Sequence, residues 1–112
     1  MSKQLISDKA LDAAFDYLNE NSDKIAAARA NVLRMEYKVK AVKARLILGG
    51  DGAMGLREAY AVSSSEYAAA CEDHVLAAEA WEFATDQRKR AEMIVEAWRT
   101  ENASRRAVDR IR

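Results

Sequence analysis

The sequence predicts an all-α fold, built on a long antiparallel helical hairpin that resembles a coiled coil. Three observations predict it. The 112 residues include no proline and only four glycines, while alanine is frequent. Proline breaks helices and alanine favours them. Apolar residues recur at helical spacing over long segments, and a single glycine cluster separates the two longest of these segments.

The basic segment 22–48 organises the predicted fold. Its apolar residues alternate at spacings of three and four, which is typical of the seam of a heptad-bearing helix. They are Ile25, Ala28, Val32, Met35, Val39, Val42 and Leu46. The flanks carry Lys24, Arg29, Arg34, Lys38, Lys40, Lys43 and Arg45, against the single acid Glu36. Such a helix cannot bury its seam alone, so we expect a partner helix.

Before this segment, residues 1–21 predict a short N-terminal helix with Ser7 as its N-cap and Asp8 in its first turn. Its apolar face is Leu11, Ala14, Phe15 and Leu18. Five polar residues at 19–23 favour a break, with Ser22 capping the next helix. The alternative is one helix that continues through a weak point.

Residues 49–53 predict the turn of the hairpin, because Gly49, Gly50 and Gly52 tolerate conformations that end helices. A phosphate-binding loop would need a Gly-Lys-Ser/Thr ending and a preceding strand, and this segment has neither. The glycines therefore indicate a helix–helix connection.

Residues 54–104 predict an acidic, alanine-rich helix or a pair of helices, followed by a frayed basic tail at 105–112. Met54–Val62 would form the short first member of a pair. Ser63 and Glu66 match a capping box, so the last helix would start near Ser64. Its apolar stripe is Ala77, Ala80, Trp81, Ala84, Ala91, Ile94 and Trp98, with the polar Gln87 between them.

Charge predicts how the long helices pair. Residues 58–86 contain no lysine or arginine and carry Glu58, Glu66, Glu72, Asp73, Glu79, Glu82 and Asp86. Antiparallel folding about the glycine turn would lay this acidic run beside the basic one. Apolar residues outside the seams then exceed what one hairpin covers: Leu33, Tyr37, Ile47, Tyr67, Leu76, Phe83 and Val95. We therefore expect a homodimer that forms a helical bundle.

The composition points away from catalysis and from a membrane. With one cysteine and one histidine, Cys71 and His74, no third group is present to orient a nucleophile–base pair. Two such residues also fall short of a structural zinc site, so we expect no metal, no cofactor and no small-molecule substrate. A single cysteine fits a reducing cytoplasm. Met1–Ile6 lacks a signal-peptide core, and no apolar run reaches the ~20 residues of a membrane span.

Two surfaces are candidates for binding. A formal net charge of zero argues against a uniformly basic nucleic-acid binder. The C-terminal arginines Arg99, Arg105, Arg106, Arg110 and Arg112 have few acids near them and could contact DNA or an acidic partner. Trp98, Tyr60 and Tyr67 could stack on bases or pack in a core. The other candidate is an acidic partner-binding face made of Glu66, Glu72, Asp73, Glu79 and Glu82.

Two stretches of the chain resemble a known group of proteins. Arg57-Glu58-Ala59-Tyr60-Ala61 leads to Ser65-Glu66-Tyr67, and Ala91-Glu92-Met93-Ile94-Val95-Glu96-Ala97-Trp98-Arg99 is followed by Asn102-Ala103-Ser104-Arg105-Arg106. Together they resemble small helical proteins of tailed bacteriophages and prophages, often encoded beside homologous-recombination genes. The resemblance covers roughly residues 55–107.

The resemblance implies a function but no catalytic residue. It implies an accessory role in phage DNA recombination, replication or protection from host nucleases, in the host cytoplasm. The chain would act on a recombination protein, a host nuclease or single-stranded DNA. One alternative is an inhibitor of a host defence complex whose acidic helix imitates nucleic-acid phosphates. Another is a structural oligomerisation module.

Overall fold

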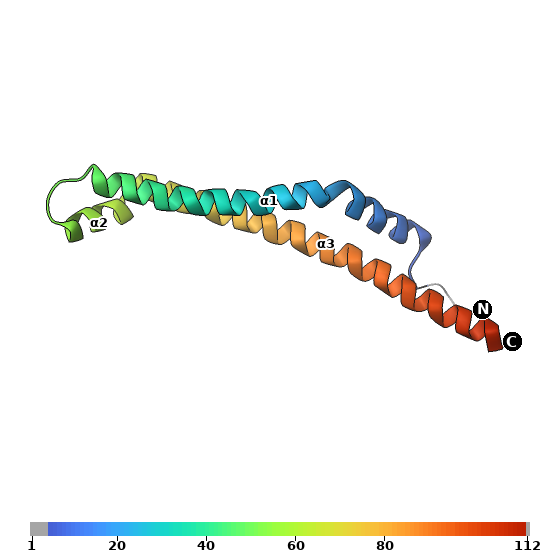
Figure 1. Ribbon diagram of the computed structural model, residues 1–112. Helices are drawn as coiled ribbons and strands as arrows, with labels where there is room; N and C mark the ends of the chain where they lie inside the picture. Colours follow the sequence, from blue (N-terminus) through green and yellow to red (C-terminus); the bar gives the residue numbers. More distant parts are fainter. Residues whose placement is uncertain (1–4, 112) are drawn as a thin grey trace. The chain divides into compact units, whose positions relative to one another are not determined.

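The computed structural model describes residues 5–111 and confirms an all-α helical hairpin. The helices are α1 (Asp8–Leu48), α2 (Met54–Ser63) and α3 (Ser65–Ile111), and α3 runs antiparallel to α1 (Figure 1). No strand occurs among these residues. The helices contribute to two compact units. Unit 1 contains residues 5–24 and 84–111 of the described chain, and unit 2 contains residues 25–83.

Helix α1 is continuous, so the break predicted at 19–23 is wrong. The physical reason is that the inward-facing spacing of three and four continues without interruption through Leu18, Asn21 and Ile25. Asn21 takes one of the inward positions, is half-buried, and donates its side-chain amide to the Tyr17 carbonyl oxygen at 3.1 Å. Since this amide is satisfied within its own helix, the polar segment does not end α1.

The start of α1 agrees with the sequence. The Ser7 hydroxyl accepts a hydrogen bond from the Ala10 N–H at 3.1 Å, which confirms Ser7 as the N-cap. The helix itself begins at Asp8. The first four residues of the predicted N-terminal helix lie outside the described residues, as does Arg112.

The predicted seam of the basic helix is confirmed in unit 2. Ile25 and Val32 are buried, and the other seam residues are half-buried. The opposing helices supply mostly small buried residues, Ala61, Ala70 and Ala77. A methyl group takes up little room, so the helix axes can approach closely. Packing of one narrow stripe per helix leaves the outer faces in water.

The connection between α1 and α2 is the predicted hairpin turn. Gly52 has a φ of 92°, a conformation that residues with a side chain rarely adopt. The Arg57 guanidinium donates from Nε to the Gly52 carbonyl oxygen at 2.9 Å. A Cβ at Gly50 would lie 3.3 Å from Cγ of Arg57. Arg57 therefore closes over the glycines and holds the turn together.

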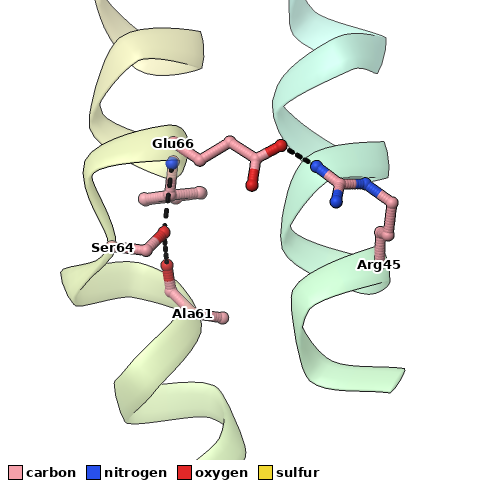
Figure 2. Close-up of polar contacts among 5 residues, drawn as sticks. Arg45, Ala61, Ser64 and Glu66 are labelled. Atoms are coloured by element: carbon pink, nitrogen blue, oxygen red, sulfur yellow. Dashed lines mark hydrogen bonds and ion pairs between the residues drawn. The ribbon is translucent and has the colours of Figure 1, made fainter. Parts of the chain in front are cut away.

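Residues 54–104 belong to two helices, which settles the alternative left open by the sequence. At the break, the Ser64 hydroxyl donates to the Ala61 carbonyl oxygen at 2.8 Å and accepts from the Tyr67 N–H at 3.1 Å (Figure 2). Ser64 is thus both the C-cap of α2 and the N-cap of α3. The predicted capping box is wrong, because the Ser63 hydroxyl donates back to the Tyr60 carbonyl oxygen.

Unit 1 has its own apolar core. Leu11 and Ala14 of α1 and Ala91 and Val95 of α3 are buried. The half-buried side chains packed against them are Ile6, Tyr17, Leu18, Ile94 and Trp98. Val95 is 6% exposed, so its prediction as an uncovered residue is wrong.

The predicted frayed tail is also wrong for residues 105–111, which continue α3 to Ile111. Helix α3 is held there by polar contacts after its apolar stripe has faded. Arg105 pairs with Glu101 one turn earlier, at 3.2 Å. This i, i+4 arrangement supports a helix in the orientation that its dipole favours.

Candidate binding surfaces

The charged runs of unit 2 pair as the sequence predicts. Lys38 Nζ lies 2.9 Å from an Asp73 carboxylate oxygen, and Arg45 pairs with Glu66 (Figure 2). Moving seven residues along α1, from Lys38 to Arg45, moves the partner back by seven residues along α3. The acidic and basic runs therefore face each other in antiparallel register.

A third contact extends this register toward the other end of unit 2. The Arg29 guanidinium lies 4.9 Å from the centroid of the Trp81 ring, within cation–π range. The side chains of Lys38, Asp73, Arg45 and Glu66 are 45–61% exposed, so water and salt screen their pairing. Exposed pairs contribute at most about 1 kcal/mol each. Their main effect is to select the register.

Glu101 is a structural residue that the sequence did not reveal. Its two carboxylate oxygens accept hydrogen bonds from the N–H groups of Leu5, at 2.8 Å, and Ile6, at 3.2 Å. These bonds, above all the one from Leu5, with a contribution from Arg105, lower the pKa of Glu101 below its usual value of 4.5. In the sequence, this glutamate lies beyond the apolar stripe, and nothing in its local pattern identifies a partner 95 residues away.

The predicted arginine-rich surface is divided by the structure. Arg105 is half-buried and engaged with Glu101, and Arg99 lies 3.5 Å from Glu96. Arg106 and Arg110 are exposed and form no ion pair with any residue in the range 5–111. Trp98, the aromatic residue predicted with them, packs against the unit 1 core. Arg106 and Arg110 are therefore the exposed arginines of this group that have no ion-pair partner in the described chain.

The predicted acidic face is divided in the same way. Glu66 and Asp73 point to α1 and are engaged there. Glu72, Glu79 and Glu82 are exposed and have no ion-pair partner in the described part of the chain. Three of the five predicted acidic residues are therefore available to another molecule.

Large apolar side chains are exposed on both long helices of unit 2. On α1, Leu33 is 51% exposed and Tyr37 is 74% exposed, while on α3 Leu76 is 53% and Phe83 is 68% exposed. Of the other residues predicted to be uncovered, Ile47 and Tyr67 are half-buried. Near the turn, Leu48, Met54, Leu56 and Tyr60 are also exposed. Large exposed apolar side chains gathered on one helix surface are candidates for contact with another molecule.

The remaining candidates for a chemical site are Cys71, His74 and a hollow at the turn. Cys71 and His74 are half-buried, and a side-chain hydrogen bond with Cys71 raises the pKa of Tyr67. No group of three potential metal ligands occurs among residues 5–111. A shallow hollow at the turn is lined by Gly49, Gly50, Asp51, Leu56, Arg57 and Tyr60. Its one cation is Arg57, which donates from Nε to the Gly52 carbonyl oxygen.

Comparison with protein-family models, curated proteins and solved structures finds no match to this chain. Of the helices in the described chain, none combines the length and the apolar content that a membrane span requires.

Proposed function

We propose that this protein acts by binding, as a phage accessory protein in DNA recombination, DNA replication or protection from host nucleases. The observation that carries the binding role is the exposure of Leu33, Tyr37, Leu76 and Phe83 on long, regular helices. A helix surface of this kind is suited to another helix or another protein. The resemblance of residues 55–107 to phage-encoded helical proteins supports the biological setting.

The proposed partners are macromolecules. The first is a second copy of the chain, since the exposed apolar residues fit a homodimer. The second is a recombination protein or a host nuclease in the host cytoplasm. The third is single-stranded DNA, for which Arg106 and Arg110 are exposed cations without an ion-pair partner in the described chain. The protein would need no cofactor for any of these roles.

The experiment that tests binding to single-stranded DNA compares two pairs of cations. Single-stranded DNA should bind weakly, and its log affinity should fall with log salt by about 0.7 per phosphate neutralised. Reversal of Arg106 and Arg110 to glutamate should weaken binding strongly. The matched control reverses Lys38 and Arg45, and should weaken it less because Asp73 and Glu66 of α3 already pair with these two cations. Fluorescence anisotropy with a labelled oligonucleotide at two salt concentrations measures both effects.

Two outcomes of this experiment would change the proposal. Equal loss from the two double variants would mean that the basic run of α1 is open to DNA. No binding at low salt would exclude single-stranded DNA as a partner and leave a protein target. Capture from a host lysate followed by mass spectrometry would identify that target.

One alternative function is favoured by a specific observation. Glu72, Glu79 and Glu82 lie along an exposed part of α3 without a cation beside them in the described chain. A row of carboxylates on a rigid helix can imitate nucleic-acid phosphates, which would make the protein an inhibitor of a DNA-binding host defence complex. Competition between this protein and DNA for such a complex, lost on conversion of the three residues to glutamine, would support it. If neither DNA binding nor competition is found, a structural oligomerisation role remains.

A further inference from the structure

We propose that a second copy of this chain docks through unlike faces, with the outer face of α1 in one copy resting on a side face of α3 in the other. This inference rests on the self-association in the proposed function and names the surfaces that make it. The outer α1 face consists of Ala26, Ala30, Leu33, Tyr37, Ala41, Ala44 and Leu48. The α3 side face consists of Ala69, Leu76, Ala80 and Phe83. All eleven residues are exposed.

The outer α1 face is a second apolar seam on a helix that has already buried one. Its residues follow one another at spacings of three and four, and none of them is charged. Leu33 directly follows the buried Val32, so the two side chains point about 100° apart around the helix axis. A helix that packs only within its own hairpin typically carries polar residues at outward positions such as those of Leu33 and Tyr37.

The α3 side face has the same character. Leu76 and Phe83 are seven residues apart, two helical turns, and Ala80 lies between them. Each directly precedes an inward-facing residue of α3, since Leu76 precedes the buried Ala77 and Phe83 precedes the half-buried Ala84. The small Ala69 and Ala80 leave room for large side chains such as Leu33 and Tyr37 of another helix.

Charge decides which faces meet. Residues 25–48 of α1 carry six lysines and arginines against one glutamate, whereas residues 65–83 of α3 carry five acids and no cation. A contact between two α1 helices would bring like charges together, and so would a contact between two α3 helices. Only the contact of α1 with α3 places opposite charges on both flanks of the apolar seam.

The ions needed for this contact are left over within one chain. On α1, Arg34 and Lys43 form no ion pair within the described chain, and Lys40 reaches only Glu36 of its own helix, at 3.9 Å. On α3, the corresponding unused carboxylates are Glu72, Glu79 and Glu82. The pairing that joins α1 to α3 inside the hairpin would thus be repeated between two copies. Each long helix of unit 2 would then gain a second neighbour of opposite charge.

The test uses two variants that each damage one face. Tyr37→Glu places an acid where the acidic α3 should dock, and Phe83→Lys places a cation where the basic α1 should dock. Both side chains are largely exposed, so each variant should keep its helical circular dichroism spectrum. Matched controls change exposed residues outside the two faces: Ala27→Glu on α1 and Val75→Lys on α3.

Light scattering over a hundredfold concentration range should report at least twice the chain mass of 12.5 kDa for the wild type and both controls. Each face variant alone should give the mass of one chain. An equimolar mixture of the two should regain at least the dimer mass, because Tyr37 of one chain and Phe83 of the other restore one intact contact. Contacts between like faces predict no such rescue.

The inference is overturned if the wild type stays at one chain mass, or if mixing leaves both variants at one chain mass. Its failure is separate from failure of the proposed function. Arg106 and Arg110 lie outside both faces, so anisotropy with single-stranded DNA, or capture of a host protein, can succeed with monomeric Tyr37→Glu.

Discussion

Glu101 shows how one carboxylate can secure a chain end that has no helical partner of its own. Leu5 and Ile6 precede α1, so their N–H groups have no acceptor inside a helix. The carboxylate of Glu101 accepts both, and its side chain is only 15% exposed. The contact joins residues from the two ends of the described chain within unit 1.

The lowered pKa of Glu101 predicts a pH-dependent stability. Because the folded-state pKa is below the value of 4.5, the stabilisation is complete above that value and is lost as pH falls through the lower, folded pKa. Glu101→Gln should lower the melting temperature at pH 7 and reduce its drop between pH 5 and pH 3. Thermal melts followed by circular dichroism across this range provide the measurement. Glu96→Gln, on an exposed part of α3, is the control, and an equal effect from both would contradict this role of Glu101.

At the scale of the helices, the sequence predicts buried faces better than helix ends. The seam from Ile25 to Leu46 could be predicted because it depends only on a repeating spacing. The same spacing predicts a continuous α1, since Asn21 occupies an inward-facing position, whereas the polar composition of 19–23 favours a break. The choice between Ser63 and Ser64 as a cap depends on one backbone conformation, which two adjacent serines do not encode.

The candidate site was only partly predictable for a similar reason. The acidic and basic runs are visible as blocks, yet which members pair depends on where each side chain lies around its helix. Each residue of an α-helix is rotated by about 100° from the one before it, so Arg106 points away from the side of α3 that carries Arg105. Composition does not contain this detail. Contacts between residues far apart in the sequence, such as Glu101 with Leu5, carry no local signal at all.

The seam of α1 gives a prediction at this scale. Val39→Asp places a carboxylate in the packed stripe between α1 and α3, where a charged group loses part of its contact with water. We expect destabilisation of about 2–3 kcal/mol, seen as a large drop in the melting temperature. Val75→Asp, at an exposed position of α3, should change it little. An unchanged midpoint for Val39→Asp would remove Val39 from the seam.

At the scale of the whole molecule, charge reverses along both long helices. Helix α1 begins with acids at 8, 12, 16 and 20 and becomes basic from Lys24 onward. Helix α3 is acidic up to Asp86, and between 88 and 110 its seven cations outnumber four acids. In each compact unit, an acidic segment therefore meets a basic one. A hairpin shifted by half its length would oppose like charges, so the pattern specifies the register.

A charge swap tests this account. Lys38→Glu and Asp73→Lys should each lower stability slightly, and the double variant should recover most of the loss. A double-mutant cycle should give a coupling of about 0.2–1 kcal/mol that shrinks in 1 M salt. Urea unfolding of the four proteins at both salt concentrations measures it. A coupling that is absent at low salt would mean that the 2.9 Å contact does not contribute to register.

The five-residue connection between α1 and α2 has a topological consequence. The bent connection makes α1 and α3 of the same chain pack together. Without the bend, the same α1–α3 contacts could form between two chains, with α1 of one packed on α3 of the other. Gly52 at its φ of 92° and Arg57 closed over Gly50 keep this hinge bent. Residues that straightened the hinge would leave every seam contact available and convert folding into domain swapping, an exchange that strained or rigid hinges promote. The glycines of the turn thus reverse the direction of the chain and also favour packing within one chain over domain swapping between two.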